Sequence, residues 1–173
     1  MKLTAVMQRY ILHWGEMGTR WGVNRSQAQI HALLFLSPRP LNADEISDTL
    51  GVARSNVSVG LRELMTWQLV HVTQTLGDRR DYFKAEQDTW EMIRIIIEGR
   101  KRRELDPTIA ALRECQTLLG HDSETPRAVR ERIVAQLEFL ESLTGWYERI
   151  SKLPRATLLK MMRLGERIAK VIG

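Results

Sequence analysis

The clearest structural signal in this 173-residue chain lies in residues 42–85, which read NADEISDTLGVARSNVSVGLRELMTWQLVHVTQTLGDRRDYFKA. Asn42 followed three residues later by Glu45 is typical of a helix N-terminal capping box. Gly51 stands where that helix would end, because glycine tolerates the left-handed conformation of a C-cap. A second helix then begins near Arg54, and its apolar stripe consists of Val57, Leu61, Leu64 and Met65. The pattern predicts two short helices joined by a tight turn.

The polar side chains of the second helix lie off this apolar stripe. They are short hydrogen-bonding groups and arginines near the N-terminal end, namely Arg54, Ser55, Asn56, Ser58 and Arg62. Such donors suit the reading of base edges and phosphates in a major groove. We therefore predict a DNA-recognition helix, with an ordinary solvated helix face as the alternative.

A β-hairpin with a basic tip follows the second helix. Residues 69–75 are rich in β-branched side chains, and residues 81–83 can return as a second strand. Arg79 and Arg80 lie at the tip, where they would meet DNA backbone or a narrow minor groove. Because Asp78 or Asp81 can pair with one of them, we expect one arginine to be structural and the other to contact DNA.

These features together resemble the DNA-binding core of MarR-type regulators, and more narrowly their GbsR-like branch. The resemblance rests on residues 41–46 (LNADEI), 50–58 (LGVARSNVS) and 77–83 (GDRRDYF), preceded by glycines around Arg20. It covers the first half of the chain well and the second half only in helical layout. It implies a homodimeric transcriptional regulator, usually a repressor, whose DNA affinity responds to a small ligand.

The expected fold is mainly α, with a small β-hairpin wing: a winged helix-turn-helix plus a helical dimerisation region. Residues 1–25 form an N-terminal helix, and the resemblance assigns them to the dimer. Residues 26–86 form the DNA-binding domain. Residues 87–173 are expected to form a C-terminal helical region for dimerisation, where an effector can also bind. This region has a break or kink at Asp106-Pro107 and a basic run at residues 100–103.

The helix expected after Pro126 carries a heptad-like seam, which is the strongest dimerisation signal in the chain. Its apolar members are Val129, Ile133, Leu140, Leu143, Tyr147 and Ile150. The alternative is a helix that packs within its own chain. A final helix is expected after Pro154.

Composition limits the other classes of function. The net charge of +5 is spread over both halves, so the case for DNA rests on where the arginines lie. The chain has one cysteine, Cys115, which fits a reducing cytoplasm and is predicted to be a small core residue, with a redox sensor as the alternative. No apolar run is long enough for a membrane span. No catalytic, cofactor-binding or metal-ligand motif is evident, which argues against an enzyme, and the four histidines are scattered.

Eight aromatic side chains can contribute to a pocket for a quaternary ammonium ligand through cation–π attraction, although a core role is the expected one. They are Tyr10, Trp14, Trp21, Trp67, Tyr82, Trp90, Trp146 and Tyr147. The sequence thus predicts a homodimeric regulator that binds double-stranded DNA at a pseudo-palindromic operator and responds to a small effector. The alternative from another class is a winged-helix adaptor that binds proteins and not DNA.

Overall fold

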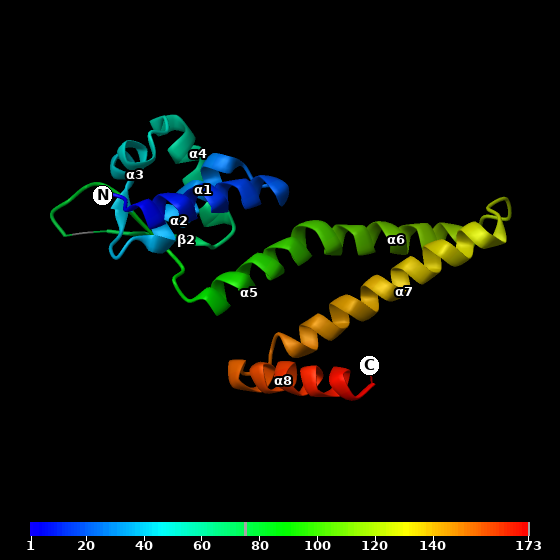
Figure 1. Cartoon of the computed structure of the whole chain (residues 1–173). Helices are drawn as coiled ribbons and strands as arrows, with labels where there is room; N and C mark the ends of the chain where they lie inside the picture. The colour runs from blue at the N-terminus through cyan, green and yellow to red at the C-terminus, as the bar shows by residue number, and fades with distance from the viewer. Residues whose placement is uncertain (75, 173) are drawn as a thin grey trace. The chain divides into compact units, whose positions relative to one another are not determined.

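The computed structural model of the chain describes residues 1–74 and 76–172, and of residues 166–172 it describes the backbone alone. The chain forms two compact units, residues 1–97 and 98–173. Unit 1 contains α1 (Ala5–Arg20), α2 (Arg25–Leu36), β1 (Leu41–Asn42), α3 (Ala43–Leu50), α4 (Arg54–Thr66), β2 (Val70–Thr73), β3 (Tyr82–Ala85) and most of α5 (Thr89–Arg100) (Figure 1). The predicted class, mainly helical with a small β wing, is confirmed.

The helix-turn-helix forms where the sequence predicts it. Asn42 accepts from the N–H groups of Asp44 and Glu45, and Glu45 accepts from the Asn42 N–H at 2.9 Å, which completes the capping box. Gly51 then adopts φ +64°, so the chain turns into α4. Val57, Leu61 and Leu64 are buried and Met65 is half-buried, as the apolar stripe predicts.

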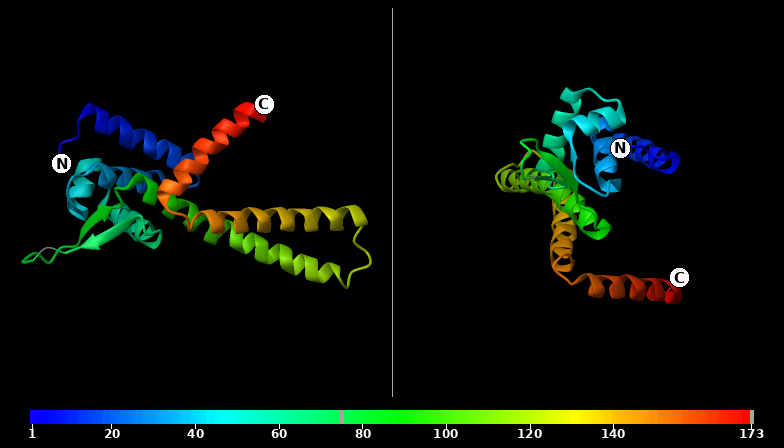
Figure 2. Two further views of the ribbon diagram at one scale, coloured as in Figure 1. Left: turned by 90° about the horizontal axis from the view of Figure 1, so that it is seen from below. Right: turned by 90° about the vertical axis from the view of Figure 1, so that its left-hand side faces the viewer.

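The sheet has three antiparallel strands in the order β1-β3-β2. The predicted hairpin is present: Val70 pairs with Ala85 and Thr73 with Tyr82. Sequence reasoning did not predict β1, in which Leu41 pairs with Phe83. Since β1 runs directly into the capping box of α3, it ties the base of the wing to the helix-turn-helix. Figure 2 shows the hairpin projecting from unit 1. Thr75, expected in the first strand, lies outside the described residues.

The core of unit 1 is built on α2, whose apolar residues Ile30, Leu33 and Leu34 are almost completely buried. Helix α1 packs closely against α2. A Cβ atom added at Gly18 would lie 2.5 Å from the Ala28 Cβ, so this glycine permits the close approach of the two helices.

Unit 2 contains η1 (Lys101–Leu105), α6 (Asp106–Leu119), α7 (Arg127–Ile150) and α8 (Arg155–Ile172). Helices α6 and α7 form an antiparallel hairpin, visible in Figure 2. At Asp106-Pro107, where we predicted a break or kink, the chain stays helical: the π-helical turn η1 leads directly into α6. A π-helical turn changes the register of the backbone hydrogen bonds. Pro107, which has no N–H group to donate, is therefore accommodated without ending the helix.

The basic run at residues 100–103 is partly engaged within unit 2. The Lys101 ammonium lies 2.9 Å from Asp106 and 3.0 Å from Glu148, and Arg100 pairs with Glu104. These contacts favour a structural role for this part of the run.

Cys115 is exposed on α6, so the prediction of a core residue is wrong. In a two-helix hairpin each helix buries only one stripe, and Cys115 lies off the stripe that contains the buried Ile109.

Candidate nucleic-acid interface

The exposed face of α4 carries the predicted recognition residues. Ser55, Asn56 and Arg62 are exposed. The first turn of α4 has no side-chain cap, because Ala53 occupies the N-cap position. Its N–H groups therefore stay available to an anion such as a phosphate oxygen.

Arg54 is held in place by two neighbours. Its Nε donates to Asp44 Oδ1 at 2.6 Å, and its NH1 donates to Ser58 Oγ at 3.1 Å. The Ser58 hydroxyl also donates to the Arg54 carbonyl oxygen at 3.1 Å. Ser58, which we predicted on a phosphate, here supports Arg54. From the sequence we predicted Asp44 only as part of the start of a helix, and not as a partner of Arg54. The one sequence signal for that pairing was an acidic residue in the first turn of α3.

The two arginines of the wing differ in their surroundings. Arg80 forms an ion pair with Asp78 at 2.6 Å, and its guanidinium lies 5.7 Å from the centre of the Tyr82 ring. The Tyr82 hydroxyl donates to Asp78 at 2.9 Å. The hydrogen bonds from Arg80 hold the pKa of Asp78 well below its usual range. Arg79 makes no ion pair or hydrogen bond within the described part of the chain and is exposed.

A groove of about 280 Å³ runs between the start of α3, the exposed side of α4 and the base of the wing. Its charged and polar lining residues are Asn42, Asp44, Arg54, Ser58, Arg62, Arg80 and Asp81. Three arginines thus line one groove, which lies between the predicted recognition helix and the wing. This is the arrangement expected of a surface that tracks a phosphate backbone.

Comparison with known proteins agrees with this geometry. Residues 21–81 match the MarR family model. The chain is therefore similar to MarR-family transcriptional regulators. The HTH-type transcriptional repressor OpcR of Bacillus subtilis (strain 168) is 20% identical over 77% of this chain and 74% of its own length. The repressor GbsR of the same strain is 21% identical over 77% and 75%. The predicted resemblance to the MarR family and its GbsR-like branch is confirmed.

A solved structure supports a shared fold for most of this chain. The crystal structure of a transcriptional regulator covers 84% of this chain and 95% of its own, with a TM-score of 0.60 and 17% identity. At this identity the likeness shows the fold alone.

The predicted dimer seam on α7 stays partly uncovered within unit 2. The buried residues of α7 are Leu137 and Thr144, which lie beside the seam on the helix surface. Among the seam residues, Val129 and Leu143 are 40% and 41% exposed, whereas Ile133, Leu140, Tyr147 and Ile150 are half-buried. Helix α7 therefore packs on α6 through a neighbouring stripe, and this packing covers only part of the seam.

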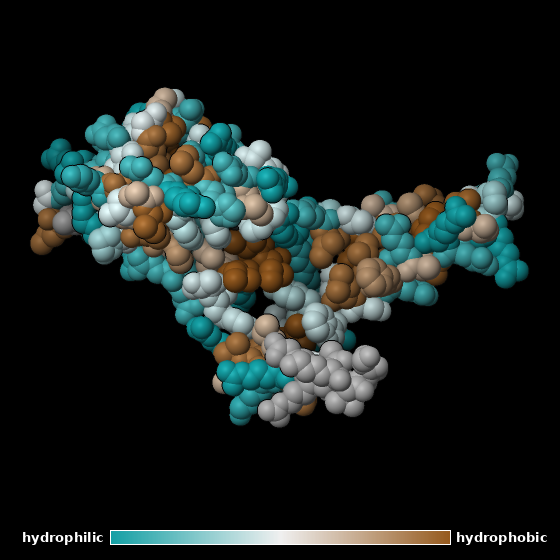
Figure 3. Space-filling model, in the orientation of Figure 1, coloured by the Kyte–Doolittle hydropathy of each residue, from teal (hydrophilic) through white to brown (hydrophobic). Residues whose placement is uncertain are grey.

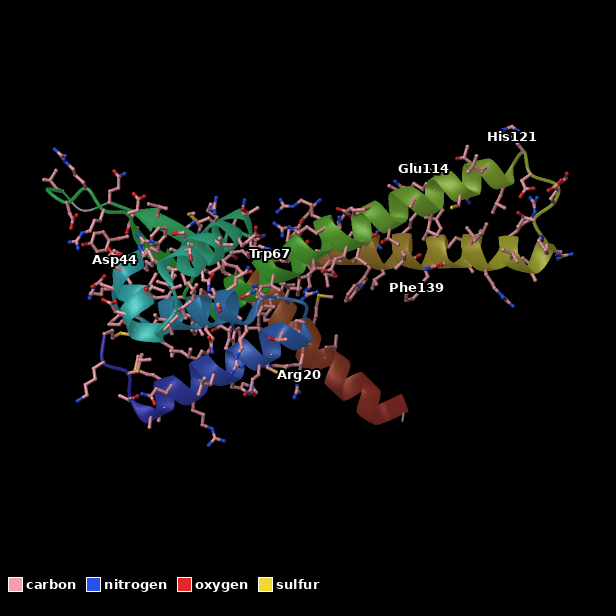
Figure 4. All side chains as sticks on the ribbon, turned by 90° about the horizontal axis from the view of Figure 1, so that it is seen from above. Arg20, Asp44, Trp67, Glu114, His121 and Phe139 are labelled. Atoms are coloured by element: carbon pink, nitrogen blue, oxygen red, sulfur yellow. The ribbon has the colours of Figure 1, made fainter. Side chains whose placement is uncertain are left out.

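Further apolar side chains are exposed beside the seam. Phe139 is 66% and Trp146 53% exposed. Figure 4 shows Phe139 on the side of α7 that faces away from α6, and Figure 3 shows apolar side chains gathered on the hairpin.

The eight aromatic residues do not converge on one pocket. Tyr10 and Trp14 stack at 5.6 Å between ring centroids, and Trp21 meets Trp14 edge-on at 6.5 Å. His31 and Phe35 complete this cluster between α1 and α2. Tyr82 instead belongs to the wing, and Trp146 and Tyr147 to α7. Rings that stack on one another fill the space in which a cation would lie, so this cluster has the packing of a core.

Neither a metal-binding cluster nor a membrane-spanning helix is found in the described part of the chain. No group of three or more His, Cys, Asp or Glu side chains is placed to hold a metal ion. No helix of residues 1–172 has the length and apolar character that crossing a membrane requires.

Proposed function

We propose that this protein is a transcriptional regulator, a homodimeric repressor that binds a pseudo-palindromic duplex, with one α4 in the major groove of each half-site. The wings then lie over the flanking minor grooves. Arg54, Asn56 and Arg62 contact bases or nearby phosphates, Ser55 contacts a phosphate, and Arg79 contacts the backbone near the wing.

One observation carries this proposal. The groove between α4 and the wing is lined by Arg54, Arg62 and Arg80, and the ion pair with Asp78 fixes the shape of the wing tip beside it. A preformed basic surface of this kind loses little conformational entropy on binding a rigid duplex.

Dimerisation is proposed through the uncovered side of α7. A helix of 24 residues with Phe139, Leu143 and Trp146 exposed leaves an apolar face in water. Contact with the same face of a second copy would bury it, and two-fold symmetry would present the two recognition helices about one helical turn apart. Residues 1–25 and 87–173 are proposed to supply this dimer, and residues 26–86 to bind the DNA.

The test is selection of the tightest sequences from random duplex DNA, followed by binding of the selected site at two salt concentrations. We expect an inverted repeat and a steep salt dependence, because each neutralised phosphate releases counterions. If no duplex binds even at low salt, the adaptor function becomes the better explanation. Release of DNA by a small ligand stays a prediction, to be tested by screening effectors against the selected site.

A further inference from the structure

The position of the Arg54 side chain is set by a carboxylate from another helix. Asp44 lies in the first turn of α3, where Figure 4 labels it, and Arg54 lies in the first turn of α4. The Nε–Oδ1 distance of 2.6 Å is that of a charge-assisted hydrogen bond. Ser58, one turn further along α4, holds the NH1 end of the same guanidinium.

Stability does not explain this pair. The side chains of Arg54 and Asp44 are 52% and 66% exposed, and exposed ion pairs contribute little to folding. Capping of α3 does not need the Asp44 carboxylate either, because Asn42 and Glu45 form the capping box.

The two contacts leave a defined part of the guanidinium free. Arginine has five N–H donors, and Asp44 and Ser58 engage the one on Nε and one of the two on NH1. The remaining donors lie at the outer end, on NH1 and NH2. A fork of this kind fits the O6 and N7 acceptors of a guanine in the major groove.

The carboxylate also has a cost for DNA binding. A negative charge on the face that meets DNA repels phosphates, so Asp44 lowers the affinity for any duplex. Any favourable contribution of Asp44 to DNA recognition must therefore come from orienting the Arg54 side chain.

We propose that Asp44 is a positioning residue that fixes Arg54 on one guanine of each half-site, and so sets sequence selectivity without touching the base. This inference rests on the proposed DNA-binding function. It makes Asp44 a specificity determinant of the recognition surface.

The test repeats the random-duplex selection with the full-length wild type, Asp44→Asn, Arg54→Ala and the control Asp48→Asn. Asp48 lies one turn further along α3, is exposed, and removes the same charge when substituted. Affinity is then measured for the selected site and for that site with each base pair replaced in turn, and thermal unfolding verifies that the variants fold.

We expect Arg54→Ala to abolish the preference for one guanine per half-site, which a bidentate contact makes about 5- to 150-fold. Asp44→Asn should reduce the preference at that same position by about threefold or more, while its affinity for random duplex stays equal or rises. Asp48→Asn should keep the preference. In the Arg54→Ala background, Asp44→Asn should change nothing further at that position.

Separate outcomes overturn the two proposals. If the wild type enriches no sequence, the proposed function fails. If the wild type enriches a site but Asp44→Asn keeps the full guanine preference, the role of Asp44 fails. If Arg54→Ala alters no position, the guanine contact of Arg54 fails with it, while the proposed DNA-binding function stands in both cases. Equal losses of guanine preference in Asp44→Asn and Asp48→Asn would point to a general charge effect. That result would also refute the role of Asp44.

Discussion

Asp78 and Arg80 form a two-pronged ion pair at the tip of the wing, with NH2–Oδ2 at 2.6 Å and Nε–Oδ1 at 3.0 Å. The Arg80 backbone N–H also donates to Asp78 at 3.0 Å. The charge of Arg80 is thus paired within the wing, whereas the charge of Arg79 is exposed. The two adjacent arginines therefore have different tasks.

Replacing Arg79 by alanine should weaken binding to selected and random duplexes alike. Loss of one phosphate contact should make the slope of log K against log salt shallower by about 0.9. Titrations at several salt concentrations measure this slope. Arg113→Ala, which removes an equal charge from a pair with Glu141 in unit 2, is the control. If Arg79→Ala and Arg80→Ala both leave affinity and slope intact, the wing does not contact DNA.

Gly18→Ala should destabilise unit 1 by about 1–3 kcal/mol through overpacking against α2. The added methyl group would lie 2.5 Å from the Ala28 Cβ. Gly145→Ala is the matched substitution in α7, where the nearest atom is 3.6 Å away at the end of the Arg149 side chain. There alanine should raise stability by about 1 kcal/mol through helix propensity. Urea unfolding compares the two, and equal effects would contradict the proposed close packing of α1 on α2.

Acid should destabilise unit 1 through His31. This side chain is 3% exposed, and its Nε2 has no hydrogen-bond partner within the described residues. Burial lowers the pKa of His31 from 6.5 to about 4, so the folded state resists a proton that the unfolded chain accepts. The free energy of unfolding should fall by about 3 kcal/mol as the pH drops from about 6.5 to 4.

Denaturation between pH 7 and pH 4 tests this dependence. His31→Leu, of similar volume, should flatten the profile above about pH 5, where the carboxylates have not yet titrated. A variant profile parallel to that of the wild type would show that another group is responsible.

Leu143→Glu should weaken self-association. A carboxylate placed in the apolar seam of α7 would be buried without a partner, which should cost the dimer about 2 kcal/mol or more. Sedimentation at several protein concentrations measures the change. Leu118→Glu, at a 68% exposed position of α6 outside the seam, is the control. If Leu143→Glu associates as the wild type does, the dimer uses another surface.

Several features of the site could be predicted because their causes are local in the chain. The Asn42–Glu45 capping box and the left-handed Gly51 each depend on residues within one helical turn, so residue type and spacing suffice. The division of labour in the wing was predicted only in part. The sequence indicated that one arginine would pair with an aspartate, but it did not identify Asp78 and Arg80 as the partners.

Features that depend on distant residues needed the tertiary structure. Asp44 and Arg54 are ten residues apart, and only the crossing angle of α3 and α4 brings their side chains together. The same holds for β1, which exists because Leu41 meets Phe83, and for Cys115, whose exposure depends on which stripe of α6 packs on α7. Sequence periodicity shows that a helix has an apolar face, whereas the packing partner decides how much of that face is covered.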